Sequence, residues 1–285
     1  MRLAHGWHVA AFAWALAAAT AAQASPQRVV STFLCTDEYV FRLLPRERIA
    51  ALSYLSADRH PVVSTIADEV AGIPLVHDSA EEVLARHPDA VVMFAGTQAR
   101  LHAQLRAAGV TIIDANWSQS LDAVRLDALA LGRALGVEAR AKALLDDMDR
   151  MLASARAPSP PVRTLIYEPN GYAGSDPLTD EILHKAGLTN VGGEIGTTRS
   201  GVVPVEAVVA NPPELLLLSN ADPRPSLANL VLHHPAFRSL AGHTLIAPVS
   251  LRALACPGPW SVGVAPELAR LGGKARALAP GAHRP

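Results

Sequence analysis

The sequence predicts an α/β protein of two lobes, each a mostly parallel sheet flanked by helices, joined by one long α-helix. Three observations support this prediction. Short apolar runs alternate with helical patterns in both halves of the chain, which is typical of parallel sheets covered by helices on both faces. A stretch without strand patterns, 118–156, separates the halves. Finally, a similar block of sequence occurs at the same place in each half.

The first half alternates regularly between the two patterns. Strands are predicted at 28–33, 48–53, 72–76, 90–95 and 110–115, and helices at 36–44, 79–88 and 97–109. The run AVVMFA (90–95) is continuously apolar, as expected for a strand buried on both faces. Ser79 is expected to cap its helix, because its hydroxyl can accept a hydrogen bond from a first-turn amide. Thr36 is predicted to cap the first helix in the same way.

The long helix lies in the middle of the chain. Helices are predicted at 121–136 and 137–156, and the second has apolar residues at helical spacing and a length of about 30 Å. The proline-rich stretch 157–161 ends it. Beyond it we predict strands at 163–169, 214–219 and 243–248, and helices at 177–187, 203–211, 227–242 and 264–273. We therefore expect an N-terminal lobe (25–136), a connecting helix (137–157) and a C-terminal lobe (158–285).

The first 24 residues are predicted to be a signal peptide. Arg2 precedes a short apolar stretch (9–22), and Ala22-Gln23-Ala24 gives an A-x-A exit. The stretch is shorter than the about 20 residues that a spanning helix needs, although an uncleaved anchor is the alternative. No cysteine sits at the exit, so we expect a secreted, periplasmic protein without a lipid anchor. The formal net charge of −1 gives no basic excess for a nucleic-acid partner.

The chain has two cysteines, Cys35 and Cys256, far apart in the sequence. Thiols can pair in an oxidising compartment, and a disulfide here would join the start of the fold to its end. Two buried free thiols or two soft ligands are the alternatives, because the sequence does not fix the distance between the Cα atoms.

The repeated blocks are EEVLARHPDAVVMF (81–94) and EAVVANPPELLLLS (206–219), which align without a gap. A duplicated architecture explains them, and a common helix-to-strand transition is the alternative. With the block RVVSTFLCTDEYVFRLLPRERIAALS (28–53) and the long helix, they resemble the periplasmic substrate-binding proteins of ABC importers in the helical-backbone class. That family serves cobalamin, iron-siderophore and haem uptake. The resemblance implies a small-molecule ligand clasped between the lobes, limited hinge motion, and delivery to a permease in the inner membrane.

The resemblance also implies docking on the permease through one acidic residue on each lobe. By position these are Glu81 and Glu206, the first residues of the two blocks. Each carboxylate lies near a predicted helix N-terminus and is available to an arginine of the partner. A glutamate that only complements the helix dipole is the alternative.

The turns after the strands should face the cleft, because open α/β sheets bind ligands at the carboxyl ends of their strands. Tyr and Trp faces suit a corrin, a porphyrin or a catecholate ring, with ordinary packing as the alternative. Arg199 could meet a ligand carboxylate, and His77 is the best single candidate for an axial ligand to haem iron or cobalt. The predicted ligand-binding residues are Cys35, Thr36, Tyr54, Gln98 and Trp117 in the first lobe and Tyr172, Arg199, Asn220 and Trp260 in the second.

Enzyme signatures are not found in the sequence. No G-x-S-x-G elbow, P-loop or G-x-G-x-x-G follows a predicted strand, so we expect no catalytic residue and no cofactor. Asp37 and Glu38 form an acidic pair that we attribute to a helix start. The histidines do not converge on a predicted metal site. We expect a monomer whose cargo is cobalamin or a related corrinoid, then a ferric siderophore, with haem uptake, a periplasmic enzyme and a metal carrier as alternatives.

Overall fold

The computed structural model describes residues 25–60, 63–174, 176–195, 201–219 and 226–278. The predicted signal peptide (1–24) and two predicted ligand contacts, Arg199 and Asn220, lie outside the described residues. Among the helices of the described part, none is both long and apolar enough to cross a membrane.

The first lobe is built on a parallel sheet in the strand order β3-β2-β1-β4-β5. Its elements are β1 (Val29–Ser31), α1 (Leu34–Leu43), β2 (Ile49–Ser53), β3 (Leu75–Val76), α2 (Ala80–Leu84), β4 (Ala90–Phe94), α3 (Ala99–Ala107) and β5 (Thr111–Ala115). The apolar run of β4 is buried on both faces, as predicted. Val91 and Met93 pack toward α2 and α3, whereas Val92 and Phe94 belong to the core on the side of α1.

The second lobe is built on a parallel sheet in the order β7-β6-β8-β9. Its elements are β6 (Val162–Tyr167), α6 (Pro177–Lys185), β7 (Leu188–Asn190), α7 (Val205–Ala210), β8 (Leu215–Ser219), the 3₁₀ helices η4 (Leu227–His233) and η5 (Pro235–Leu240), β9 (Leu245–Val249) and α8 (Ala265–Leu278). The sequence pattern does not predict β7, because three residues are too short for a periodicity. The helix predicted over 227–242, with a break near Pro235, is two 3₁₀ helices separated at His234, so the break is confirmed and the helix type differs.

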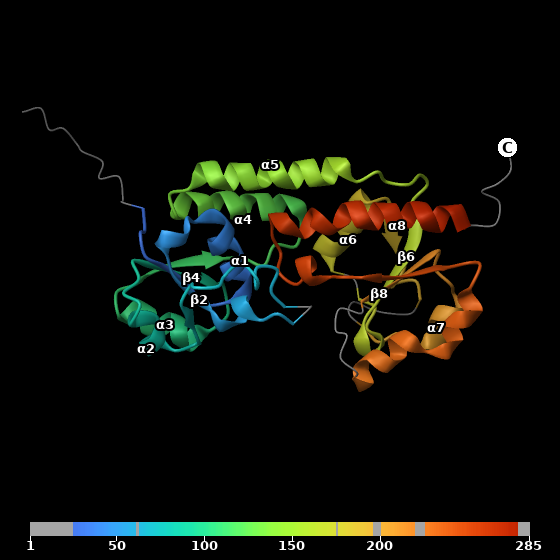
Figure 1. Ribbon diagram of the computed structural model, residues 1–285, viewed down its shortest axis with the longest axis horizontal. Helices are drawn as coiled ribbons and strands as arrows, with labels where there is room; N and C mark the ends of the chain where they lie inside the picture. The colour runs from blue at the N-terminus through green and yellow to red at the C-terminus, as the bar shows by residue number, and fades with distance from the viewer. Residues whose placement is uncertain (1–24, 61–62, 175, 196–200, 220–225, 279–285) are drawn as a thin grey trace, which may run out of the picture.

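The helix α5 (Glu138–Ser154) runs along the outside from the first lobe toward the second, where α8 continues the same layer (Figure 1). It forms a hairpin with α4 (Leu121–Ala134) and also contacts α8. Its apolar stripe, which includes Leu145 and Met148, is buried in a core that includes residues of both sheets. The predicted fold class, two α/β lobes joined by one long helix, is therefore confirmed.

The predicted cap of the first helix is wrong. Helix α1 begins at Leu34, and its N-cap residue Phe33 makes no side-chain capping bond. Thr36 lies inside the first turn, where its hydroxyl donates to the carbonyl oxygen of Phe33 at 2.8 Å. By contrast, Ser79 caps α2 as predicted and accepts a hydrogen bond from the amide of Glu82.

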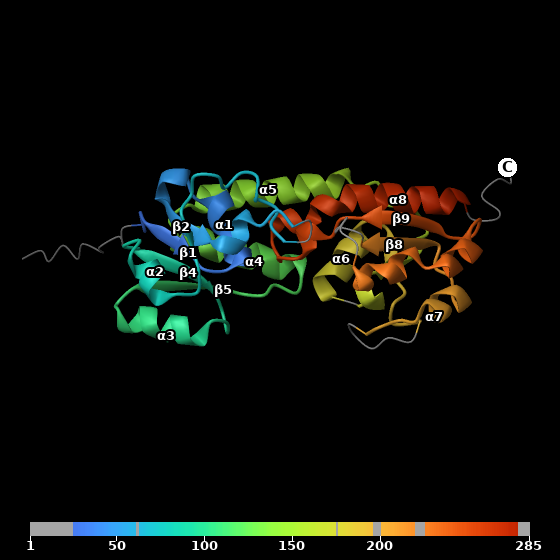
Figure 2. The ribbon, with the colours of Figure 1, turned by 60° about the horizontal axis from the view of Figure 1, so that its bottom comes forward.

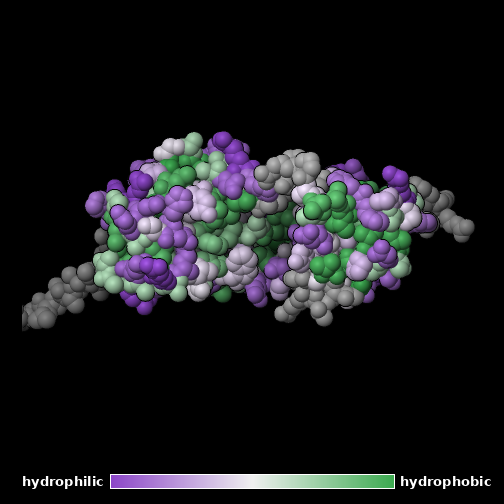
Figure 3. Space-filling view, turned by 90° about the horizontal axis from the view of Figure 1, so that it is seen from below, coloured by the Kyte–Doolittle hydropathy of each residue, from purple (hydrophilic) through white to green (hydrophobic). Residues whose placement is uncertain are grey.

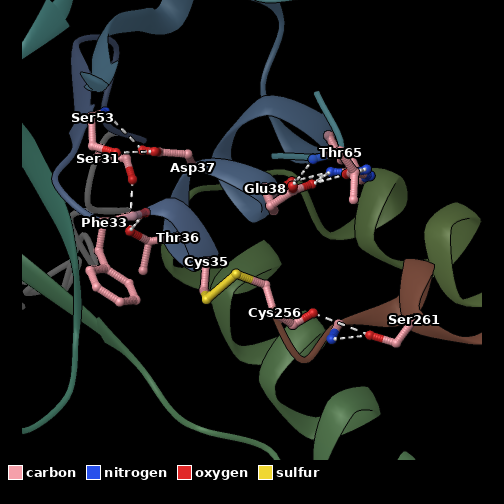
Figure 4. The surroundings of a disulfide bond; sticks show 12 residues. Ser31, Phe33, Cys35, Thr36, Asp37, Glu38, Ser53, Thr65, Cys256 and Ser261 are labelled. Carbon is pink, nitrogen blue, oxygen red and sulfur yellow. Dashed lines mark hydrogen bonds and ion pairs between the residues drawn. A yellow bond between two sulfur atoms is a disulfide. The ribbon is translucent and has the colours of Figure 1, made fainter. Parts of the chain in front are cut away.

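Helix α1 also buries both members of the acidic pair (Figure 4). Asp37 accepts hydrogen bonds from the amide of Ser53 at 3.0 Å and from its hydroxyl at 2.5 Å. Glu38 accepts from the amide of Thr65 at 2.8 Å and forms an ion pair with Arg42. The prediction that these acids only favour the start of a helix is therefore incomplete, because each carboxylate accepts hydrogen bonds from a segment distant in the sequence. Asp37 fixes the end of β2 directly before the next loop.

Burial raises the pKa of Asp37 to about 7, although hydrogen bonds from Ser31 and Ser53 oppose the shift. Its ordinary pKa is 3.8, so the folded protein retains this proton between about pH 4 and pH 7 while the unfolded chain loses it. Proton binding to Asp37 thus stabilises the fold fully at low pH, and this contribution declines as the pH rises toward 7.

We predict that Asp37→Asn removes this pH dependence. Asparagine keeps an acceptor for the amide of Ser53 and stays neutral at all pH values. Relative to the wild type, the variant should gain stability between pH 4 and pH 8 by at most about 4 kcal/mol, the equivalent of a shift of about three pKa units. Urea unfolding at several pH values measures this difference. Asp146→Asn, at an exposed acid of α5, is the control, and an equal pH response of both variants would contradict the prediction.

Candidate functional site

A hollow separates the two lobes on the side opposite α5, and hydrophobic residues are visible on its floor (Figure 3). Because both sheets are parallel, the loops after their strands gather at one edge of each lobe. In the first lobe these loops follow β1, β2, β3, β4 and β5. In the second, the turn after β6 and the helix η4 lie in contact. These segments are the structural basis of a cleft.

The first-lobe wall contains a row of aromatic rings from three strand ends. The ring centroid of Phe94, the last residue of β4, lies 5.5 Å from that of Phe33 and 5.4 Å from that of Trp117. Phe94 is buried, whereas Trp117 remains 46% exposed. Trp117 is one of the predicted ligand contacts, whereas the two phenylalanines that support it are not. Their positions in the sequence, at or just beyond the end of a predicted strand, could have identified both phenylalanines as residues of the wall.

A second aromatic pair follows β2 and β3. The rings of Tyr54 and His77 stack at 4.7 Å with an angle of 25° between their planes. Tyr54 is 47% exposed. The Nδ1 atom of His77 lies 3.3 Å from a carboxylate oxygen of Glu82, and that oxygen also accepts from the amide of His77 at 2.8 Å. The amide hydrogen bond holds the pKa of Glu82 below its usual range. A phenol and an imidazole are thus presented side by side to solvent.

Gln98 connects the cleft loops to each other. Its backbone is left-handed, with φ +49°, and its amide nitrogen donates to the carbonyl oxygen of Thr32 at 3.0 Å and to Asp78 at 2.5 Å. The hydroxyl of Thr32 donates to the side-chain oxygen of Gln98 at 2.9 Å. These bonds join the ends of β1 and β4 to the segment before α2, so Gln98 positions loops of the wall.

The second-lobe wall is a tight turn after β6. Gly171 has φ +78°, and a Cβ there would lie 3.0 Å from the hydroxyl oxygen of Tyr167 and 3.1 Å from the carbonyl oxygen of Val203. The next residue, Tyr172, is 46% exposed and pairs with the exposed Val202 through an isolated bridge. Two leucines of the adjacent η4 are also exposed. Glu168 begins the turn, and burial raises its pKa. This wall is therefore largely apolar.

Three predicted ligand contacts are buried in the structure. Cys35 is bonded to Cys256 with the Cα atoms 5.0 Å apart, so the disulfide exists and no free thiol remains at either position. Thr36 is fully buried and hydrogen bonded within α1. Trp260 is only 8% exposed, because its ring packs edge-on against Tyr39 of the first lobe at 4.8 Å. The prediction placed it on the wall of the second lobe and was wrong.

Metal-ligating side chains do not cluster in the described part of the chain. Within residues 25–278, apart from the gaps given above, no group of three or more His, Cys, Asp or Glu is arranged to hold an ion. A cavity of about 450 Å³ lies where the lobes approach each other, between Thr65 of the first lobe and residues 248–253 and 263–267 of the second.

The two predicted docking residues are both exposed in the first turn of a short helix. Glu81 lies in α2 and Glu206 in α7, and these helices lie on the same side of the molecule in Figures 1 and 2. A cavity of about 580 Å³ adjoins Glu81, between the start of α2 and the start of α3.

Comparisons with known proteins agree with this architecture. Among solved structures, the chain is similar to the haem-binding protein HutB of Vibrio cholerae, with 16% identity and a TM-score of 0.70 over 86% of this chain and 98% of that one. It is similar to the haem-binding protein BhuT in complex with two haems, with 24% identity and a TM-score of 0.67 over 90% and 100%. It is also similar to the vitamin B12-binding protein BtuF of Vibrio cholerae, with 18% identity and a TM-score of 0.61 over 88% and 98%.

At these identities the structural likeness establishes the fold. No curated protein matches the chain. A family model described as periplasmic binding protein matches residues 67–241, more than half of the chain. This chain therefore belongs to the periplasmic binding protein family, as its resemblance to the substrate-binding proteins of ABC importers predicts.

Proposed function

We propose that this protein captures a metal-bearing organic complex between its lobes and delivers it to an ABC permease in the inner membrane. The observation that carries the proposal is the set of half-exposed rings on opposing walls: Tyr54 and Trp117 in the first lobe and Tyr172 in the second. Aromatic rings of a folded protein are usually more deeply buried, and rings exposed in a hollow suit a flat, partly apolar ligand. A corrin, a porphyrin and a catecholate all have such faces.

Haem is the second candidate besides a corrinoid, and a specific observation favours it. Tyr54 and His77 present a phenol oxygen and an imidazole side by side, and both groups are known haem-iron ligands. The fold is that of solved haem-binding and vitamin B12-binding proteins, which supports a tetrapyrrole cargo of either kind. Capture requires no reaction in either case. The rings contact the faces of the cargo, and closure of the lobes excludes water from it.

Delivery depends on the carboxylates of Glu81 and Glu206. We propose that each pairs with an arginine of the permease, because guanidinium groups bind carboxylates through two parallel hydrogen bonds. Each lobe then carries one attachment point. The permease can hold both lobes at once and separate them, which opens the cleft to release the cargo.

We predict that Tyr54→Ala weakens binding of the cognate tetrapyrrole about tenfold, because it removes one stacking face and its buried area. Titration of the purified protein with haemin and with cyanocobalamin, followed by absorption spectra, measures this loss. Tyr54→Phe separates the two cargoes. If the phenol binds haem iron, this variant should weaken haemin binding and change its spectrum. If the ring only stacks on a corrin, affinity should stay within about twofold, a few tenths of a kcal/mol.

The control for this series is Leu126→Ala, which truncates an exposed leucine of α4. Its affinity should equal that of the wild type. Failure of haemin, cyanocobalamin and a ferric siderophore to bind would overturn the proposed cargo class. Formation of a chemically altered product would instead support an enzyme on this scaffold.

We predict that the double variant Glu81→Lys/Glu206→Lys keeps its ligand affinity and loses transport. The reversed charges repel the permease arginines, whereas the cleft rings are unchanged. Uptake of radiolabelled cargo into cells that carry the matching permease measures transport, and titration of the purified protein measures affinity. Glu47→Lys/Asp146→Lys reverses two other exposed acids and is the control for net charge. Normal uptake by the first variant would refute the docking role.

A further inference from the structure

A segment of the second lobe crosses to the first lobe and returns. We call residues 250–264 the strap. It begins after β9 and ends at α8, and both of these elements pack in the second lobe. Its helix η7 (Pro259–Val264), however, contacts α4 and α5 at the first lobe. The lobes are therefore connected along the chain by α5 and in space by the strap (Figure 1).

The strap is attached to one face of α1. The disulfide joins Cys256 to Cys35 (Figure 4), and Trp260 packs against Tyr39. The guanidinium carbon of Arg42 lies 4.5 Å from the centroid of the Trp260 ring. The attachment points on α1 are four and then three residues apart, so they lie on the same side of the helix. The disulfide attaches the strap near the start of α1, and the aromatic contacts of Trp260 attach it near the end of α1.

The strap itself is held in a fixed turn. The buried hydroxyl of Ser261 donates to the carbonyl oxygen of Cys256 at 3.2 Å and accepts from the amide of Gly258 at 3.1 Å. The ring of Trp260 covers Gly258 so closely that a Cβ there would lie 2.3 Å from it. The strap is therefore a rigid connection between the lobes and not a flexible segment of chain.

Helix α1 extends this connection to the cleft. Its N-cap residue Phe33 is part of the aromatic row of the first-lobe wall, and Asp37 holds Ser53, the residue directly before Tyr54. The bonded Cys35 lies between Phe33 and Asp37 in the sequence. A shift of the strap relative to α1 thus moves the second lobe relative to the rings of the first-lobe wall.

We propose that the disulfide between Cys35 and Cys256 is a second, covalent connection between the lobes, which together with α5 limits how far the lobes can move apart and hence how wide the cleft can open. A single connecting helix permits bending and twisting at its ends, and a second attachment away from it restricts both motions. This inference goes beyond the proposed function, because it holds whatever the cargo is.

The connection is opened by thiol–disulfide exchange. A dithiol such as dithiothreitol supplies two electrons and two protons, the sulfur–sulfur bond breaks to give two thiols, and the reagent becomes a cyclic disulfide. The strap then remains attached to the first lobe only by non-covalent contacts, those of Trp260 with Tyr39 and Arg42 and those of η7 with α4 and α5, and the lobes gain freedom to move apart.

The test measures the distance between the lobes in the cargo-free protein. Thioether-linked nitroxides at Gln104→Cys and Arg238→Cys, two exposed positions in different lobes, report it by pulsed electron spin resonance. We expect one narrow distance distribution in the oxidised protein. Reduction by dithiothreitol, or the double variant Cys35→Ser/Cys256→Ser, should broaden it and add longer distances. The double variant should not respond further to the reductant.

Labels at Gln104→Cys in the first lobe and at Ala139→Cys, in the first turn of α5 where it leaves that lobe, form the control pair and should keep their distance distribution. If the double serine variant does not fold, the reduced wild-type protein with alkylated thiols serves in its place. An unchanged distance between the lobes, with thiol counting that confirms reduction, would overturn the proposal. The disulfide would then stabilise the fold without setting the cleft.

A second readout is the dissociation rate of whichever probe binds, haemin or cyanocobalamin. A wider cleft should release the probe faster after reduction, and the rate in the double serine variant should equal that of the reduced wild type. An equal rate before and after reduction would contradict the proposal even if the melting temperature falls. If neither probe binds, the proposed cargo fails while the distance measurement still decides this inference.

Discussion

Helix α1 is buried along most of its length, yet it carries charged side chains, and this combination constrains the rest of the structure. A buried carboxylate is tolerated only where hydrogen bonds replace the lost water. Asp37 and Glu38 meet this condition through residues of two other segments, Ser53 and Thr65. The helix cannot shift or rotate without leaving these groups unpaired. It therefore acts as a fixed reference to which the loops of the first-lobe wall and the strap are both attached.

The buried contacts that position the cleft loops are thus distinct from the exposed residues proposed to contact the cargo. The positions of the cleft loops are set by buried polar contacts, such as those of Asp37 and Gln98, that a cargo never touches. The surfaces available to a cargo are half-exposed rings, which can accept different flat molecules because every such molecule has an apolar face. One scaffold can thus serve several cargoes by changing exposed residues while the supporting contacts stay the same.

The sequence predicted the fold well because the fold depends on local patterns. Continuous apolar runs such as β4 and β8 indicate buried parallel strands, and the long apolar stripe indicates α5. The roles of residues that contact a partner distant in the sequence could not be predicted from local patterns. Trp260 follows a turn of the second lobe, and no local pattern shows that the strap carries it to the first lobe. Asp37 has the sequence context of an exposed helix-start acid, because its partner Ser53 is identified only by the packing of β2. The same reason left the pairing of the two cysteines open.

The disulfide also has a consequence for how the molecule is made. Cys35 and Cys256 are separated by 221 positions, so the second sulfur emerges long after the first. Until then the first thiol belongs to a lobe whose chain is already complete. The bond can therefore form only after residue 256 has been synthesised, when the strands of both sheets are already present. A chain arrested before residue 256 carries an unpaired thiol at Cys35 on α1.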